Sequence, residues 1–499
     1  MLNIISVFGL LFLLSLAWLM SSHRDRVDWR LVVFGIILQI ALAGIFFNSQ
    51  NWKFSQSYDS FDSLLKAAQA NELYLDNIPT LDDEEDAESF ATLFARLEDE
   101  NDNFTEKQFA RTYWTSGTKE VVVPRFRNGF VFSAVESFFG LIQKSVDAGS
   151  SFVFETHAPA KSDDTTHPKA ILTTFAFGVL PTVIFFAALM SVLYYVGFMQ
   201  RVIRIMAWVM EKTLRTSAAE SMAAAANVLV GHTEAPLVVR PYVPHMTRSE
   251  LNALMVGGFA TISGSLMAIF ASMGVSAGHL LTASLISAPA ALVIAKILQP
   301  ETETPADLAE AEAKTKQEAC NVIEAAANGA SEGMKLAINI GAMLIAFLAL
   351  IMFIDICLQT AAGWAGAELS LSIVFGWVFF PLAWVMGIES QDCLIAGDLL
   401  GKKLVVNEFL AYIEMSNQPT RLDSSGEGIS DRTRTILTYA LCGFSNFGAI
   451  GIQLGGIGPL AGEKNKKQLA QLGLRAMFGG AIAAAMTACI AGIFYGILA

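Results

Sequence analysis

Two glutamates lie within apolar segments of the chain, where a charged side chain is unusual. Glu234 stands in the segment 228–239 and Glu408 in the segment 404–410. A carboxylate at bilayer depth costs at least about 2.5–3.5 kcal/mol, so it normally faces a cavity and binds something there. These two residues are therefore the leading candidates for a binding function.

The composition around these glutamates is that of a membrane protein. The chain has 499 residues, of which 54% are hydrophobic and only 16% charged. Apolar runs close to the roughly 20 residues that a helix needs to cross a bilayer recur along it. They lie at about 2–20, 31–47, 169–199, 252–272, 277–297, 336–358, 433–452 and 473–499. The sequence predicts an all-α integral membrane fold with about eight transmembrane helices.

Basic residues indicate how the chain crosses the membrane. The first apolar run lacks a basic start and is followed by Arg24, Arg26 and Arg30, which is typical of an uncleaved anchor with its N-terminus outside. Further Lys and Arg residues follow the third run and precede the last run, where the same topology predicts cytoplasm. The sequence therefore predicts a multi-pass protein with both termini outside. It places an acidic insert, residues 48–128, on the outer side as a solvated face with weak helices at 60–72 and 86–100.

The second half of the chain is interpreted as a diverged copy of the first. Met206-Ala207-Trp208-Val209-Met210 recurs as Leu382-Ala383-Trp384-Val385-Met386. Each copy is followed by an acidic apolar segment and then by a span with a Gly-Phe pair, 258–259 or 443–444. Because the topology assigns the two Trp blocks to opposite sides, the interpretation is an inverted repeat of the kind from which transporters are built. The predicted organisation is 1–47 as N-terminal scaffold helices, 48–128 as the insert, 129–299 as the first repeat, 300–335 as a cytoplasmic linker with an interfacial helix, and 336–499 as the second repeat.

The acidic segments are predicted to form two re-entrant helical hairpins. Gly231 and Pro236 interrupt the first about halfway, since proline removes a backbone donor and clashes with the preceding turn. Irregular backbone survives at membrane depth only where protein or water satisfies it, so both hairpin tips are expected to line an internal site. The spans 252–272 and 433–452 carry glycine-rich interruptions of the same kind at 257–265 and 442–451.

Other roles remain open for the acidic residues. Glu234 and Glu408 have Arg240, Lys402 and Lys403 available as partners in a structural ion pair. Asp355 and Asp398 are equally compatible with structural and functional roles. The chain contains no Walker loop, dinucleotide fingerprint, zinc cluster or nucleophile elbow, so we expect no enzyme activity, no cofactor and no nucleic-acid partner.

Three segments in order resemble the signatures of the concentrative nucleoside transporter family, in its short, bacterial form. They are Gly-His-Thr-Glu-Ala-Pro-Leu at 231–237, Asn-Glu-Phe-Leu-Ala-Tyr at 407–412, and the glycine-rich segment 440–456. The resemblance implies a homotrimer in the bacterial cytoplasmic membrane, with a transport domain that moves like an elevator against a scaffold. It also implies symport of a nucleoside with sodium or, in some members, protons.

The resemblance further implies the residues of the site. Those for the nucleoside are His232, Thr233, Glu234, Leu266, Glu408, Phe444, Asn446 and the position of Ala449. Those for sodium are Asn227, Val230, Thr261 and Ile262, which supply only oxygen donors and so suit a hard cation.

The chain departs from the family pattern in three places. His232 stands where the family usually has Gln, and its charge can change near neutral pH. Ala449 stands where many members have a serine hydroxyl that assists ribose binding. The acidic insert is longer than expected.

The leading hypothesis is a sodium-driven nucleoside importer. Its alternative is a proton-coupled carrier of a modified nucleoside or another polar ring compound. Two other classes remain open: a membrane receptor or channel that uses the acidic insert, and a membrane-embedded hydrolase with two carboxylates as acid and base.

Overall fold

The chain divides into two compact units, residues 1–44 with 135–499 and residues 45–134. The computed structural model describes residues 2–48, 52–58, 113–114, 121–127, 137–138, 140–141, 145–146, 180–229, 231–232, 235–240, 242–305, 320–363, 369–419, 421 and 428–498. Thr233, Glu234 and Val230 of the predicted site lie outside these residues, as do the weak helices predicted at 60–72 and 86–100.

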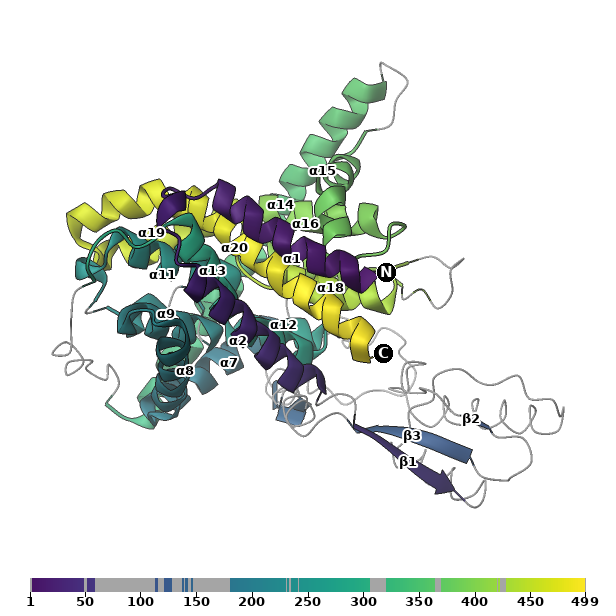
Figure 1. The fold of residues 1–499 in the computed structure, drawn as a ribbon, viewed down its shortest axis with the longest axis horizontal. Coiled ribbons are helices and arrows are strands. Elements are labelled where there is room, and N and C mark those ends of the chain that lie inside the picture. The colour runs from purple at the N-terminus through teal and green to yellow at the C-terminus, as the bar shows by residue number, and fades with distance from the viewer. Residues whose placement is uncertain are drawn as a thin grey trace, which may run out of the picture. The chain divides into compact units, whose positions relative to one another are not determined.

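The described residues of the larger unit form helices joined by turns and loops (Figure 1). Its helices are α1 (Leu2–Leu19), α2 (Trp29–Asn48), α7 (Leu180–Tyr195), α8 (Phe198–Leu214), α9 (Ala218–Leu229), α10 (Ala235–Val238), α11 (Arg248–Ala260), α12 (Gly264–Ser272), α13 (Ala277–Leu298), α14 (Val322–Gly363), α15 (Leu371–Val385), α16 (Cys393–Val405), α17 (Glu408–Asn417), α18 (Asp431–Leu441), α19 (Phe447–Ile457) and α20 (Gly462–Leu498), with short 3₁₀ helices η1 (Arg24–Arg26), η4 (Val243–His245) and η6 (Gly458–Leu460). The prediction of an all-α membrane fold is confirmed for this unit.

The smaller unit contains a three-stranded antiparallel sheet in the order β1–β3–β2. The strands are β1 (Trp52–Tyr58), β2 (Tyr113–Trp114) and β3 (Val121–Arg127), and β1 pairs with β3 from Trp52 opposite Arg127 to Tyr58 opposite Val121. The predicted insert, 48–128, falls within this unit, and its described strands add β structure to a segment for which only weak helices were predicted.

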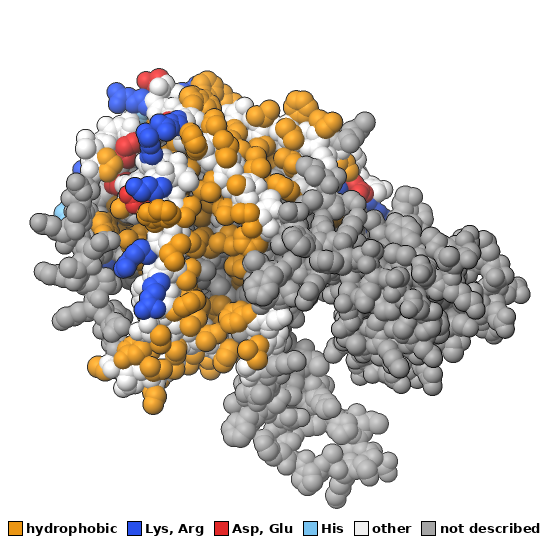
Figure 2. All heavy atoms as spheres, turned by 60° about the horizontal axis from the view of Figure 1, so that its bottom comes forward, with side chains coloured by type: hydrophobic (Ala, Val, Ile, Leu, Met, Phe, Trp, Pro, Cys, Tyr) orange, Lys and Arg blue, Asp and Glu red, His pale blue; other side chains and the backbone are white. Residues whose placement is uncertain are grey.

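Length and hydropathy mark four of the described helices as candidate membrane spans. They are 2–19, 29–46, 277–298 and 462–495, with a fifth if α7 and α8, which bend by 78°, count as one span. The broken helices α11–α12 and α18–α19 are not among these spans, because each half is too short to cross a bilayer by itself. A broad hydrophobic face bordered by a row of Lys and Arg side chains is visible in Figure 2, as expected where a protein meets lipid and then water.

One predicted element boundary differs in the structure. An interfacial helix was expected within 300–335, but α14 starts at Val322 and runs without a break into the following span. Gly329 and Gly333 do not interrupt it, because they form a close contact with α7: a Cβ at either position would lie 2.6–2.7 Å from atoms of α7. Small residues spaced in this way let membrane helices approach closely.

The two halves of the helical unit share one order of elements. Each has a hairpin, α9 with α10 or α16 with α17, followed by a broken helix, α11–α12 or α18–α19, and then a long helix, α13 or α20. The predicted interruptions are confirmed: the breaks fall at 261–263 and 442–446.

The N-terminal helix packs against this bundle. Figure 1 shows α1 beside α20, and α1 also contacts α13 and α15. Arg432 joins the two chain ends, since its guanidinium donates to Asn3 Oδ1 at 2.9 Å and to the Gly492 carbonyl at 3.0 Å. The two termini therefore lie at the same end of the bundle.

Candidate functional site

Side chains within the chain itself cap the half-helices that begin at the breaks and tips. Ser263 accepts a hydrogen bond from the Leu266 amide, Asn407 from the Leu410 amide and Asn446 from the Ala449 amide. In hydrocarbon no water satisfies such amides, so a capping side chain is needed for a helix to start at depth. Polar residues in these apolar segments thus place the helix starts.

The two broken helices meet at their breaks. The Ser445 hydroxyl donates to the Phe259 carbonyl at 2.8 Å. Gly443 has a φ of +119°, and a Cβ there would lie 2.7 Å from that same carbonyl oxygen. Glycine is required at this position both for its backbone conformation and for the close approach of α11.

The second hairpin and the second break bring Glu408 and Asn446 together. Glu408 lies in the first turn of α17 with 4% of its surface exposed. Asn446 Nδ2 donates to Glu408 Oε2 at 3.1 Å, while its Oδ1 caps α19. The cap fixes the orientation of the amide, so the carboxylate and the amide form one buried hydrogen-bonding pair that is suited to sugar hydroxyls.

The tip of the first hairpin places His232 against Phe444. The two ring centroids are 4.2 Å apart at an interplanar angle of 63°. His232 is buried, and neither ring nitrogen has a hydrogen-bond partner among the described residues. Buried polar atoms are almost always paired, so two unpaired nitrogens beside an aromatic ring point to a ligand.

Asn227 and Thr261 meet around Gly257. The Thr261 hydroxyl donates to the Gly257 carbonyl at 2.9 Å, and Asn227 Nδ2 lies 3.0 Å from the position of a Cβ on Gly257. Both polar atoms of the Asn227 side chain are buried, and neither has a partner in the described part of the chain. The Asn227 amide oxygen and the Thr261 hydroxyl, whose side chains both approach Gly257, are oxygen donors of the kind that sodium prefers.

The remaining predicted site residues are less closely tied to this cluster. Leu266 is buried in the first turn of α12, Ile262 is buried in the break, and the Ala449 amide donates to Asn446. Gln453 was not predicted, although it is a buried polar residue in the apolar segment of α19. A Cβ at Gly258 would lie 2.7 Å from both Gln453 Nε2 and His232 Cβ, so Gln453 lies beside the tip of the first hairpin.

Glu408 does not form a direct structural ion pair with Arg240, Lys402 or Lys403. Lys402 pairs with Asp398 at 2.8 Å and Glu414 at 2.5 Å instead, which gives Asp398 a structural partner. Lys403 donates to the Ala440 carbonyl at 2.8 Å, and Arg240 is exposed. Asp355 accepts a hydrogen bond from the Leu371 amide at 2.6 Å.

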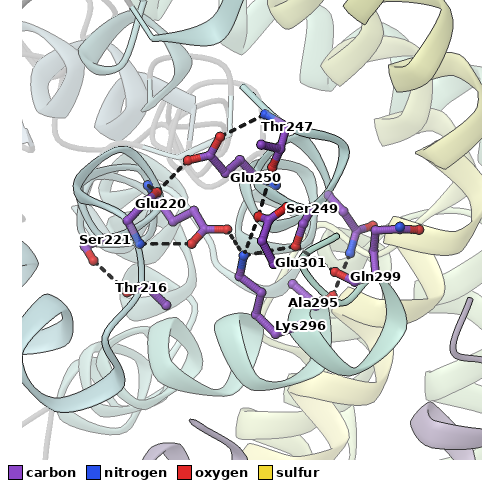
Figure 3. Close-up of polar contacts among 12 residues, drawn as sticks. Thr216, Glu220, Ser221, Thr247, Ser249, Glu250, Ala295, Lys296, Gln299 and Glu301 are labelled. Carbon is purple, nitrogen blue, oxygen red and sulfur yellow. Dashed lines mark hydrogen bonds and ion pairs between the residues drawn. The ribbon is translucent and has the colours of Figure 1, made fainter. Parts of the chain in front are cut away.

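A second polar cluster holds the base of the first hairpin (Figure 3). Lys296 of α13 forms an ion pair with Glu220 of α9 and reaches Ser249 at 2.9 Å and Glu301 at 3.3 Å. Ser217 donates to Glu250 Oε1 at 2.7 Å, and Glu250 also completes the capping box of α11 with Thr247. The cluster joins α9, α11 and α13 outside the predicted site and anchors one arm of the hairpin.

An ion-pair cluster also stands at the base of the second hairpin. Arg421 Nη1 lies 2.5 Å from Asp392 Oδ1, and its Nη2 lies 2.7 Å from Glu389 Oε2. Asp392 precedes α16 and accepts from the Ser430 amide before α18. Both hairpins are therefore tied at their bases to the broken helix that follows them.

Two hairpin tips that meet two broken helices at a buried polar site define a membrane transporter of the discontinuous-helix class. Comparison with known proteins is more specific: the chain belongs to the Na⁺-dependent nucleoside transporter family. Three family models match it: the N-terminal part at residues 8–71, a nucleoside recognition (gate) domain at 176–277 and the C-terminal part at 279–492.

Relatives in bacteria and mammals agree with this assignment. An uncharacterized transporter of Haemophilus influenzae is 46% identical over 353 residues, which are 70% of this chain and 82% of that protein. Solute carrier family 28 member 3 of Mus musculus is 42% identical over 392 residues, 75% of this chain and 53% of its own length. The sodium/nucleoside cotransporter 1 of Mus musculus is 41% identical over 359 residues, 70% of this chain and 53% of its own length. The chain thus spans about half the length of these mammalian relatives.

Solved structures of the transporter CNTnw have the same fold. Its inward-facing, substrate-bound structure matches with a TM-score of 0.75 at 34% identity, covering 100% of this chain and 99% of CNTnw. An outward-facing structure of a CNTnw double variant matches with a TM-score of 0.77, with the same identity and coverage. The resemblance to concentrative nucleoside transporters is confirmed, as is the prediction that the protein is a transporter and not an enzyme.

Proposed function

We propose that the protein is a secondary active symporter that imports nucleosides across the bacterial cytoplasmic membrane, driven by a sodium gradient. The observation that carries this proposal is the buried Glu408–Asn446 pair beside the His232–Phe444 contact. A carboxylate with an oriented amide suits ribose hydroxyls, and an aromatic ring beside unpaired polar atoms suits a flat, polar base. Thr233, Glu234, Leu266 and the position of Ala449 complete the proposed nucleoside site.

Sodium is the proposed coupling ion, held by Asn227, the Val230 and Ile262 carbonyls and Thr261. The Asn227 amide supports this assignment, because its oxygen has no partner in the described part of the chain and is available to a cation. The residues belong to the first hairpin and the first broken helix, so an ion between them would draw the hairpin onto that helix. Sodium and nucleoside binding would thereby be coupled.

A proton-coupled carrier of a modified nucleoside or another polar ring compound is the second candidate. Two observations favour it: both buried ring nitrogens of His232 lack a partner among the described residues, and Ala449 brings no hydroxyl to the cap of α19. The first introduces a group that can titrate, and the second removes a donor for ribose.

Uptake into proteoliposomes separates the two candidates. Purified protein is reconstituted, and a panel of radiolabelled nucleosides is presented under an imposed sodium gradient or an imposed proton gradient. Accumulation driven by sodium supports the main proposal and ranks the substrates. Accumulation driven by protons alone supports the second candidate, and no accumulation of any nucleoside contradicts both for natural nucleosides.

The proposed orientation places both termini outside. The Ser22 amide donates to the Leu298 carbonyl, so the α1–α2 connection lies at the same end of the bundle as the end of α13. Exposed basic residues gather at that end, with Arg24 and Arg26 in the connection and Arg30 in the first turn of α2. The positive-inside rule assigns that end to the cytoplasm and, since α1 and α20 each cross once, the termini to the other side.

A homotrimer and an elevator-like movement are proposed on the family likeness. The packing of α1 favours a different assignment for that helix within this scheme. Residues 1–47 were assigned to the scaffold, but Gly9 and Ser6 of α1 lie against Val385 and Met386, and α1 packs on α13 and α20. We therefore assign α1 to the moving domain with the hairpins.

His232→Gln is expected to change base selectivity more than maximal rate. A neutral imidazole offers one donor and one acceptor, whereas a glutamine amide offers two donors and an acceptor in a different arrangement. One altered hydrogen bond corresponds to about a tenfold change in relative affinity. The change in base selectivity is measured by letting unlabelled nucleosides compete with uptake of a labelled one. His245→Gln is the control, because His245 is exposed. An unchanged competition profile contradicts the proposed role.

Asn227→Ala is expected to raise the sodium concentration for half-maximal uptake by about 10- to 100-fold. This factor corresponds to the free energy of one contact between a polar group and a charge. Asn252→Ala is the matched control, because Asn252 is also buried but donates to the Ala295 carbonyl. The measurement is uptake as a function of sodium concentration at constant ionic strength. A sodium dependence like that of the wild type would exclude Asn227 as a ligand.

A further inference from the structure

Lys403 is a buried cation that the proposed site does not use. It lies in the last turn of α16 with 4% of its surface exposed. Its Nζ donates to the Ala440 carbonyl at 2.8 Å, and it forms no ion pair among the described residues. Its neighbour Lys402, by contrast, pairs with two carboxylates. A buried ammonium that is held mainly by a carbonyl is costly, so it needs a further explanation.

The carbonyl that Lys403 contacts lies at the broken end of α18. That helix ends at Leu441, so Ala440 is in its last turn, where carbonyls lack partners within the helix. The C-terminal end of a helix also carries a partial negative charge, which favours a cation there. Glu408, a few residues further along the second hairpin, interacts electrostatically with Lys403.

The first half of the chain has the corresponding place. There α11 ends at Ala260 before its break, and Asn227, near the end of the first hairpin arm, lies against Gly257 in its last turn. The end of the broken helix thus meets an amide without a partner among the residues that the structure describes in the first half, and an ammonium in the second. The first arrangement leaves a place for a free cation, whereas the second already contains a covalently attached one.

We propose that the Lys403 ammonium is a built-in cation that occupies a second, sodium-like site at the end of α18. This inference rests on the proposed sodium-coupled function. The fixed charge neutralises the broken helix end and the Glu408 carboxylate without an ion from solution. One free sodium ion per nucleoside is then sufficient, because the second place is permanently filled.

Sodium-dependent binding by the purified full-length protein tests this proposal. Binding of radiolabelled uridine, cytidine, adenosine and inosine is measured over a range of sodium concentrations, with choline as the replacement cation. The slope of log affinity against log sodium concentration reports the number of sodium ions bound with the nucleoside. For the wild-type protein we expect a slope of about one.

Lys403→Ala is expected to weaken binding about 10- to 100-fold at low sodium and to raise the slope to about two, since a second sodium ion can enter the vacated place. Ethylammonium, which mimics the missing side-chain end, is expected to restore affinity. Lys403→Met fills the space without a charge, so it should bind weakly with a slope of about one and without rescue. Lys402→Met is the matched control and should retain the wild-type slope.

Two outcomes would overturn the inference. One is a Lys403→Ala protein with the affinity and slope of the wild type. The other is a folded Lys403→Ala protein whose lost binding neither sodium nor ethylammonium restores, since the side chain would then act through its shape. Failure of the proposed function would give a different result, because nucleoside binding by the wild-type protein would then not respond to sodium at all. In that case the ethylammonium experiment with Lys403→Ala would by itself show whether Lys403 acts as a built-in cation.

Discussion

Glu408→Gln is expected to abolish nucleoside uptake. The substitution retains the size of the side chain but replaces a charged acceptor by a neutral amide, which makes weaker hydrogen bonds to sugar hydroxyls. A hydrogen bond to a charged group contributes about 1.5–3 kcal/mol, so loss of one or two such bonds lowers affinity by at least 10- to 100-fold. The Asn446 amide, which its cap on α19 holds in place, would then donate to a neutral amide oxygen in place of a carboxylate, so this hydrogen bond would also weaken.

Uptake by reconstituted protein measures this effect. The matched control is Glu414→Gln on the same helix, because Glu414 pairs with Lys402 and lies outside the proposed site. Thermal unfolding in detergent shows whether each variant is folded. Near-normal uptake by a folded Glu408→Gln protein would refute the assignment of Glu408 to the sugar.

Lys296→Met is expected to destabilise the protein by about 3–5 kcal/mol, since removal of one partner from a buried ion pair leaves the other charge unpaired. The partner is Glu220, with only 2% of its surface exposed. Loss of Lys296 also removes contacts to Ser249 and Glu301, which join α9 to α11 and α13. The base of the first hairpin would thereby lose its anchor.

A second substitution separates charge from packing in this experiment. In the double variant Glu220→Gln with Lys296→Met, no unpaired charge remains, so much of the lost stability should return. Lys212→Met, at an exposed position of α8, serves as the control. The fraction of protein that stays folded after heating in detergent ranks the variants. Equal loss of stability in the single and double variants would show that the ammonium stem, and not the charge, stabilises the cluster.

Several features of the fold followed from the sequence because they depend on local chemistry. Long apolar runs predicted spanning helices such as α1, α13 and α20, since an unpaired backbone is too costly in lipid for another structure to span it. Glycine-rich stretches around Thr261 and Asn446 predicted where two helices break. The position of Glu408 in an apolar segment identified it as a candidate before any contact was known.

The start of α14 differs from the boundary that the sequence predicted. Residues 300–335 were predicted to form a cytoplasmic linker with an interfacial helix, and residues 320–335 of this segment contain two glycines. In the structure they continue into α14, because packing against α7 offsets the low helix propensity of Gly329 and Gly333. Propensity is a local quantity, whereas this packing depends on a partner more than 100 residues earlier in the chain.

By itself the sequence determined that this chain enters a membrane, that its helices break near two glutamate-bearing hairpins, and which family it resembles. Only the tertiary structure decided which polar groups are paired. Glu220 pairs with Lys296, which is far from it in the sequence. Lys402 and Lys403 are the cations nearest to Glu408 in the sequence, but they have other hydrogen-bond partners. The physical reason is that hydropathy and helix breaks arise from each residue and its neighbours, while the partner of a buried charge is set by the packing of distant helices.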